Sequence, residues 1–449
     1  MDTRTHRMTP AAAPAPPPAF SHLAGANLAA QAAEQVSLAA VPMVAVLALG
    51  AGPRETGVLA AAQSLPFLLL ALPFGLWADR ASRRRLMVGA EATRVLAMAL
   101  LAALVVAASG AALSLPALAL LGFVGAVGTV AFSVAAPAMV SVLVPREALA
   151  RANGRIELAR SLAFAAGPAL AGAIVAAAGG GGAFALAALL SALAVMLLMR
   201  LPADHPRTQP AAAAMAMASS SAPEPGLGPE ASALQRSSLA ELREGARFVW
   251  RNRWLRPILL TAVVWNLSWM VLQAAYVPHA MQHLGLGARG VGFTLSLYGL
   301  GMVLGALAAS RLMSGLPLGW AIALGPLVSV FAAAAMAATL VWPSAALAAL
   351  SFFLFGAGPI VWTVSSTTVR QTLTPVAILG RVSSIFLTAN AGARPLGAAL
   401  GVAAAVIVGA QHAIAACLLL AAAGFVLQAL VIMRSPVRAL QVLPRQAAA

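Results

Sequence analysis

Long apolar stretches alternate with short polar breaks along the chain after a start rich in Pro and Ala. A helix that crosses the hydrocarbon core of a membrane needs about 20 apolar residues, and the pattern predicts twelve such stretches. The breaks between them carry turn residues or charge, such as Gly52-Pro53-Arg54 and Trp342-Pro343. The predicted spans are 22–49, 57–76, 85–109, 114–142, 156–178, 183–200, 257–281, 290–310, 318–341, 344–369, 382–409 and 412–434.

A segment without hydrophobic periodicity divides these spans into two sets of six. The halves resemble each other at a fixed offset: Gly57 to Gly75 aligns with Gly292 to Ser310, so that Gln63 meets Tyr298. The expected fold is an all-α membrane protein of twelve transmembrane helices in two pseudo-symmetric six-helix bundles. The expected parts are a disordered cytoplasmic tail at 1–21, bundles at 22–201 and 257–434, a cytoplasmic linker at 202–256 and a second tail at 435–449.

Within the linker, the capping-box pattern Ser238-Leu-Ala-Glu241 predicts a short helix that ends at Trp250. Arg243, Arg247 and Arg251 fall on one side of that helix. This spacing suits a helix at the cytoplasmic membrane interface, and a solvated linker helix is the alternative.

The composition excludes an ordinary soluble enzyme, because 61% of the residues are apolar and only 9% are charged. All 28 cations are arginine. Without lysine the chain has no phosphate-binding loop of the G-x-x-x-x-G-K-S/T type, so an ATP-driven pump is not expected. The single cysteine, Cys417, excludes an intrachain disulfide. We expect no enzymatic activity, no cofactor and no metal.

The arginines are distributed unevenly between the two sides of the membrane. If the N-terminus is cytoplasmic, 23 of them lie in the tails and loops of the cytoplasmic side and two in the opposite loops. The remaining three, Arg94, Arg160 and Arg394, lie within spans. This positive-inside bias predicts a bacterial inner-membrane protein with both termini in the cytoplasm. It also accounts for the formal net charge of +16 without a nucleic-acid partner.

The break after the second span carries a specific motif. Gly75-Leu-Trp-Ala-Asp79-Arg80-Ala-Ser-Arg83-Arg84-Arg85 resembles the G-x-L-A-D-R-x-G-R-R/K signature of the major facilitator superfamily in the same loop, with Trp77 and Ser82 as departures. The resemblance implies a transporter of small molecules in the lipid bilayer, whose spans 1, 4, 7 and 10 line a central cavity. We expect a monomer. The resemblance assigns a conformational-switch role to Gly75, Asp79, Arg80, Arg83 and Arg84.

Leu143 to Asn153 and Glu244 to Pro257 resemble the branch of macrolide-efflux and enterobactin-exporter-type proteins. Gly167-Pro168-Ala-Leu-Ala171-Gly172 resembles the G-P-x-x-G-G element of antiporter-type exporters, although close helix packing through small residues also explains it. The resemblance implies proton-driven export of a small amphipathic molecule, drug-like or siderophore-like. Uptake of a metabolite and flipping of a lysophospholipid are the alternatives. Span 4 has no arginine, so the proton-coupling element of many drug antiporters is missing.

Ionisable residues near the membrane midplane are costly and mark functional sites. Glu34 on span 1 and Arg394 on span 11 each lie about twelve residues, or about 18 Å, into their spans. Burial favours a neutral carboxyl, so we expect Glu34 to carry the coupled proton and Arg394 to expel it on approach. An anionic substrate is the other candidate partner of Arg394. Glu91 and Arg94 are expected to form a structural pair.

Polar and aromatic residues at helical spacing on spans 1, 2, 4, 7, 8, 10 and 11 are expected to line the substrate cavity. They are Asn27, Gln31, Gln63, Thr129, Ser133, Asn266, Trp269, Gln273, Tyr276, Tyr298, Trp362, Ser366 and Asn390.

The predicted orientation is tested by labelling single cysteines in a Cys417→Ser background. Gly181→Cys and Ala288→Cys should react with a membrane-impermeant maleimide from outside the cell, and Ser219→Cys should not. Reaction of the cysteine at Ser219 in intact cells would contradict the orientation.

Overall fold

The computed structural model describes residues 18–107, 113–144, 148–202, 243–375 and 378–441, and all the regular elements in these ranges are helices. The N-terminal half contains α1 (Pro18–Leu49), α2 (Pro53–Arg80), α3 (Arg83–Ala107), α4 (Leu115–Leu143) and α5 (Leu149–Met199). The C-terminal half contains α8 (Leu255–Gln282), α9 (Ala288–Gly315), α10 (Leu318–Ala338), α11 (Ala345–Leu373), α12 (Leu379–Val408) and α13 (Ala413–Met433), followed by the 3-10 helix η3 (Pro436–Ala439).

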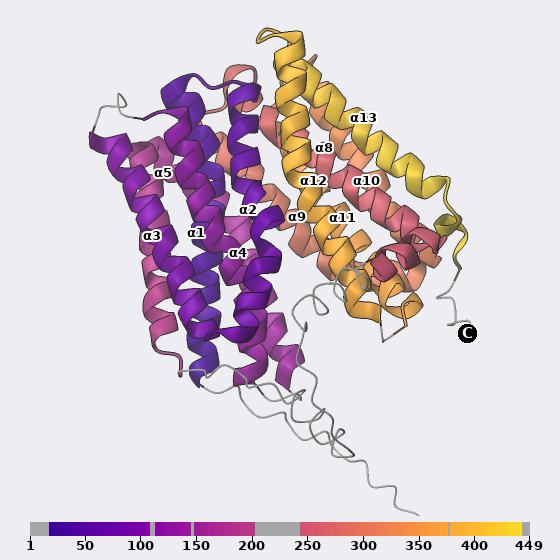
Figure 1. The fold of residues 1–449 in the computed structure, drawn as a ribbon. Coiled ribbons are helices and arrows are strands. Elements are labelled where there is room, and N and C mark those ends of the chain that lie inside the picture. The colour runs from indigo at the N-terminus through magenta and orange to yellow at the C-terminus, as the bar shows by residue number, and fades with distance from the viewer. Residues whose placement is uncertain (1–17, 108–112, 145–147, 203–242, 376–377, 442–449) are drawn as a thin grey trace, which may run out of the picture.

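The helices form two bundles that lie side by side, with the N-terminal half in indigo to magenta and the C-terminal half in red through orange to yellow (Figure 1). Ten helices in the described ranges are long and apolar enough to cross a membrane, with α5 counted once. Gly179 interrupts α5 with φ 71° and ψ 179° and divides it into two spans. With that division, and with α2, the prediction of twelve spans in two six-helix bundles is confirmed.

Two pairs of corresponding helices in the two halves have equal lengths at nearly constant offsets. The helices α2 and α9 both have 28 residues, and α4 and α11 both have 29. Both α4 and α11 begin after a serine, Ser114 and Ser344, whose hydroxyl accepts a hydrogen bond from the backbone N–H three residues later, at 3.4 Å in each case. A serine at this position satisfies one of the otherwise unpaired N–H groups of the helix end.

Four glycines with positive φ repeat at the same offsets. Gly50 and Gly285, which follow α1 and α8, both have φ 63°. Gly179 and Gly409, at the turn between the fifth and sixth span of each half, have φ 71° and 77°. Residues with a Cβ rarely adopt this left-handed region. The two halves therefore share their turn geometry as well as the lengths of two helix pairs, as expected for a duplicated six-helix unit.

The linker is described only at its end, since 203–242 and both tails, 1–17 and 442–449, lie outside the described residues. Residues 243–251 are helical, and this helix packs on the C-terminal half. Arg381 at the start of α12 donates to the Glu244 carboxylate at 2.6 Å, and Gly245 lies against the Arg381 backbone. Val249 is buried, whereas Trp250 is 57% exposed.

Two of the labelling positions chosen from the sequence are unsuitable, because Gly181 and Ala288 are buried between helices. Arg54 and Gln411 are exposed at the same end of the molecule, and Arg434 is exposed at the other end. Arg54→Cys and Gln411→Cys should therefore label from outside the cell, and Arg434→Cys should not.

The two ends of the molecule differ in how closely the bundles approach. We call the end at which α2 meets α3, with Arg83 to Arg85, the arginine-rich end. At the opposite end the Thr56 hydroxyl donates to the Ala274 carbonyl of the other bundle. A Cβ on Gly172 would lie 2.3 Å from the Ala288 carbonyl oxygen. The bundles thus touch backbone to backbone at the opposite end and diverge toward the arginine-rich end (Figure 1).

Gly172→Ala tests this backbone contact. The added methyl group overlaps Ala288 and should cost about 1–3 kcal/mol, which changes the ratio of closed to open molecules at the opposite end about fivefold or more. Spin labels at Arg54→Cys and Gln411→Cys should report a larger population of long distances. The control is Gly89→Ala in α3, where a Cβ meets nothing within 4 Å. Equal distance distributions in the two variants would show that Gly172 does not limit closure.

Candidate functional site

A cavity of about 350 Å³ lies between the bundles, and we call it the interbundle cavity. It is lined by α1 to α5 on one side and by α8, α9, α11 and α12 on the other. Thr56 and Val277 lie where it meets the closed opposite end. The kinking Pro42 and Pro168 also line it.

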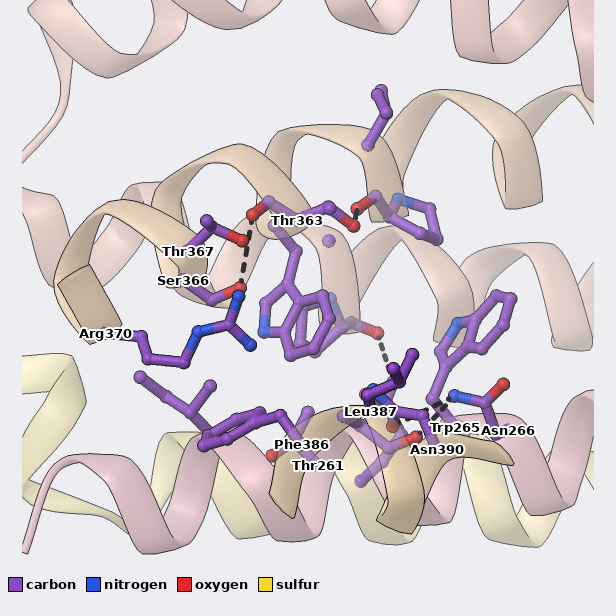
Figure 2. Close-up of a pocket in the computed structure, with 18 of the residues that line it drawn as sticks. Thr261, Trp265, Asn266, Thr363, Ser366, Thr367, Arg370, Phe386, Leu387 and Asn390 are labelled. Carbon is purple, nitrogen blue, oxygen red and sulfur yellow. Dashed lines mark hydrogen bonds between the residues drawn. The ribbon is translucent and has the colours of Figure 1, made fainter. Parts of the chain in front are cut away.

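A second cavity of about 650 Å³ lies within the C-terminal half, and we call it the C-bundle cavity (Figure 2). All its lining residues except Phe67 come from the C-terminal helices. Arg370 and Ser383, near the ends of α11 and α12, extend it toward the arginine-rich end. The two cavities adjoin, because they share Phe67, Trp265, Tyr298, Met302 and Arg394.

Glu34 faces the interbundle cavity together with Arg94, Arg160 and Arg394. All three guanidinium groups act on the Glu34 carboxyl electrostatically. Among the described residues, however, none of them lies within ion-pairing distance of it. The Arg394 guanidinium instead lies 5.8 Å from the centroid of the Phe67 ring, on the opposite bundle. Glu34 is thus a carboxyl surrounded by positive charge without a direct partner.

Arg94 holds three helices together. It pairs with Glu91 at 3.0 Å, donates to the Ala30 carbonyl of α1 at 2.9 Å and donates to the Thr129 hydroxyl of α4 at 2.6 Å. The side chains of Arg94 and Glu91 are 3% and 0% exposed. The pair forms as the sequence suggested, and Arg94 also lines the interbundle cavity. The Glu91 carboxyl is therefore buried beside the cavity wall. Glu34 is thus not the only buried carboxyl among the described residues of the N-terminal half.

A second pair with the same spacing lies on α5. Arg160 binds both carboxylate oxygens of Glu157, with Nε to Oε2 at 3.0 Å, and its guanidinium lies 5.6 Å from the Phe164 ring centroid. The side chains are 37% and 55% exposed. Unlike Arg94, Arg160 therefore belongs to the rim of the cavity rather than to the protein core.

An aromatic cluster forms the C-terminal wall of the interbundle cavity. Trp265 and Trp269 stack at 5.4 Å with an angle of 11°, and Trp269 lies 5.1 Å from Tyr298. Phe164 of the N-terminal half lies 6.3 Å from Tyr298 across the cavity. Stacked ring faces of this kind accept flat apolar groups.

Most of the expected cavity residues lie in the two cavities. The interbundle cavity contains Glu34, Gln63, Thr129, Trp269, Gln273, Tyr298 and Arg394. The C-bundle cavity contains Asn266, Tyr298, Trp362, Ser366, Asn390 and Arg394. Asn266 Nδ2 donates to Asn390 Oδ1 at 3.4 Å, which joins α8 to α12 (Figure 2).

Four expected residues lie outside both cavities. Asn27 is buried and donates to the Ile156 carbonyl at 3.4 Å, and Gln31 is half-buried on the same helix. Ser133 is exposed and bonds the Val130 carbonyl of its own helix. Tyr276 is fully buried, bonded to Thr294 and packed 4.4 Å from Phe352. Ten residues after Asn266, Tyr276 has turned about 80° around the helix and faces α9.

The switch loop is described in part. α2 ends at Arg80 and α3 begins at Arg83, and Arg84 donates to the Met199 carbonyl at the end of α5 at 2.6 Å. At Gly75, Asp79 and Arg80 only the helical backbone belongs to the described part of the chain. In the segment that resembles an exporter element, Gly167 packs against Gln35, and Gly172 against Ala288 and Gly292. Close helix packing therefore accounts for those two glycines.

Several lining residues were not expected from the sequence. Trp265 lies four residues before Trp269, on the same helix face, so the stripe on α8 could have revealed it. Arg370 was counted with the cytoplasmic arginines because it lies near the end of its span. Phe67 and Phe386 lie in apolar helices, where the pattern gives no sign of which ring borders a cavity.

Two helical bundles around a buried cavity that carries few charges define a class of multi-pass membrane transporters. Residues 23–398 match the model of the Major Facilitator Superfamily. The chain belongs to this family, as its loop motif indicated. No curated protein matches the sequence significantly.

Solved structures share the fold at low identity. A variant of the nucleoside transporter NupG is 14% identical with a TM-score of 0.71, and the match covers 92% of this chain and 99% of that one. A D-xylose-proton symporter is 14% identical with a TM-score of 0.67, covering 93% and 97%. A bacterial homologue of the lysosomal transporter Spinster, solved inward-facing and unoccupied, has the same identity and TM-score, covering 93% and 99%.

The two Glu–Arg pairs give a matched test of burial. Glu91→Gln leaves Arg94 charged inside the protein and should destabilise it by about 3–5 kcal/mol. Glu157→Gln breaks an exposed pair of the same spacing and should cost about 1 kcal/mol or less. The measurement is the melting temperature of each purified variant in detergent. Equal melting temperatures would mean that Arg94 finds compensation in its bonds to Ala30 and Thr129.

Proposed function

We propose that the chain is a secondary transporter that exports small amphipathic organic molecules, driven by the proton gradient across a bacterial inner membrane. The observation that supports this most is the interbundle cavity, which combines an aromatic wall with an unpaired carboxyl. Cargo would bind between the bundles, whose rocking exposes the cavity to each side in turn.

The proposed conformation follows from the contacts between bundles. With the arginine-rich end in the cytoplasm, the closed end is periplasmic and the molecule is open inward. An exporter loads its cargo in this state. The positive-inside distribution of arginines supports the orientation.

The proposed proton site is Glu34. It borders the cavity and is surrounded by Arg94, Arg160 and Arg394, of which Arg394 belongs to the other bundle. When the bundles move, the distance between Arg394 and Glu34 changes, and with it the affinity of the carboxyl for a proton. Proton release would thus be tied to the conformational change without an arginine on α4.

The alternatives differ in direction or in the origin of the cargo. Uptake of a metabolite would use the same cavity in the reverse direction. One solved structure of similar fold is, by its name, a symporter of D-xylose and protons. A lysophospholipid flippase would load its cargo from the membrane leaflet. The experiment below separates export from uptake.

Glu34→Gln tests the coupling. The cargo is first identified as an organic compound that disappears from culture supernatants when the gene is deleted. Wild-type protein in inverted vesicles should then accumulate this compound when the vesicle interior is acidified. The glutamine variant cannot release a proton, so it should still exchange cargo downhill but lose accumulation.

Glu244→Gln, which removes an exposed carboxyl that borders neither cavity, is the control and should accumulate cargo normally. Wild-type accumulation by Glu34→Gln would mean that the coupling group lies elsewhere. Proton-driven accumulation in right-side-out vesicles instead would identify the protein as an uptake carrier.

A further inference from the structure

The acidic residues of this chain are confined to its first part, with consequences for the C-bundle cavity. The sequence contains 12 Asp and Glu residues, and the last of them is Glu244, before α8 begins. The C-terminal bundle therefore contains arginines but no acidic side chain of its own, and Arg381 at the start of α12 pairs with Glu244 of the preceding helix. Two of these arginines, Arg370 and Arg394, line the C-bundle cavity.

Arg370 has neither an ion pair nor a hydrogen bond among the described residues, and its Nε is buried without an acceptor. Its guanidinium lies 4.8 Å from the centroid of the Phe386 ring. Figure 2 shows the side chain extending from the end of α11 toward Ser366. The position near the negative end of a helix and the ring contact favour a cation there, but neither satisfies its N–H groups.

Two more donors line the same cavity without a partner. The indole Nε1 of Trp362 and the hydroxyl of Thr261 are buried with no hydrogen bond among the described residues. Thr261 is 1% exposed. Buried donors are nearly always paired in proteins, so the contents of the cavity must satisfy these groups. An oxyanion offers several acceptor atoms at once and also neutralises a guanidinium.

Apolar and aromatic side chains make up much of the rest of the wall, beside the polar side chains of Asn266, Thr363, Ser366, Thr367, Ser383, Asn390 and Gln428. Trp265, Phe386, Leu387 and Ile360 surround the polar groups, and the volume of about 650 Å³ falls in the range of pockets for drug-sized ligands. A small inorganic anion would leave these walls in contact with water. An anion joined to an aromatic or acyl body would cover them.

On these grounds we propose that the C-bundle cavity is the cargo subsite for the anionic group of an amphipathic organic anion, with Arg370, Trp362 and Thr261 as its donors. This inference rests on the proposed transport function and specifies its cargo. The shared residues Phe67, Trp265, Tyr298, Met302 and Arg394 connect the subsite to the interbundle cavity. The anion is a carboxylate or phosphate, carried either by a soluble molecule or by a lysophospholipid headgroup.

Equilibrium binding to the purified full-length protein tests the proposal. The probes are 1-naphthylacetate and 1-naphthylethanol, which share a ring system and differ in charge. The acid should bind at least tenfold more tightly than the alcohol, because only the acid pairs with Arg370. Equal binding of the two probes, or no binding of the acid, would overturn the proposal.

Substitutions locate the binding site. Arg370→Gln should weaken binding of the acid about tenfold or more, and Arg370→Lys should retain part of the affinity. Arg256→Gln is the control, because Arg256 also lies over an aromatic ring, that of Trp250 at 5.3 Å, but borders neither cavity. Trp362→Phe removes one donor with little change of shape and should weaken binding severalfold even if Arg370→Gln does not fold. Arg256→Gln should bind the acid as tightly as the wild type does. If Trp362→Phe also bound it that tightly, the proposal would be overturned.

Competition distinguishes the two sources of the anion. Displacement of radiolabelled 1-naphthylacetate by lysophosphatidylglycerol but not by a monoacylglycerol with the same acyl chain, which lacks the phosphate, would support the subsite and assign it to a lipid headgroup. Displacement by neither would support it and assign it to a soluble anion. Displacement by both equally would overturn recognition of the charge. Binding requires no gradient, so a protein that binds the acid but fails to pump would overturn the proposed function and leave the subsite intact.

Discussion

The permanent charge of arginine inside a membrane protein is the constraint on which this structure depends. A guanidinium keeps its proton, so each arginine within a span needs a carboxylate, a set of carbonyls, an aromatic face or contact with water. Arg94 has the first two, and Arg160 has an exposed partner and a ring. Arg370 and Arg394 have only rings among the described residues. These arginines line the two cavities: Arg94, Arg160 and Arg394 line the interbundle cavity, and Arg370 and Arg394 line the C-bundle cavity.

Opposite charges lie on different bundles, so a movement of one bundle against the other changes the electrostatic interactions at the cavities. Among the described residues, the one carboxyl group that lines the cavities, Glu34, belongs to the N-terminal half, and the unpaired guanidinium groups of Arg370 and Arg394 belong to the C-terminal half. Any rocking of one bundle against the other changes the distance between opposite charges across an environment of low dielectric. A conformational change and a change in proton or anion affinity are therefore coupled by Coulomb's law, whichever cargo is carried.

The sequence predicted the fold well because its strongest signal is the length of apolar runs, and the membrane fixes that length. The repeat offset, the positions of Gln63 and Tyr298 and the Glu91–Arg94 pair also followed from spacing alone. Helical periodicity could not place Tyr276, because it gives the angle of a residue around its helix but not whether the cavity or α9 lies on that side. It could not single out Arg370 either. Whether Arg370 finds a carboxyl partner depends on the residues of the helices packed around it, and the pattern along one helix does not show them.

The glycine contacts between Gly172, Ala288 and Gly292 make one end of the molecule close through backbone atoms without charged side chains. Van der Waals contact at such short range is insensitive to salt and pH, so this seal should hold equally in acidic, neutral or saline surroundings. In the proposed orientation, the end that faces the exterior would be shielded from its chemistry. Control over opening would then belong to the charged interior, which responds to the occupant of the cavity rather than to the medium outside.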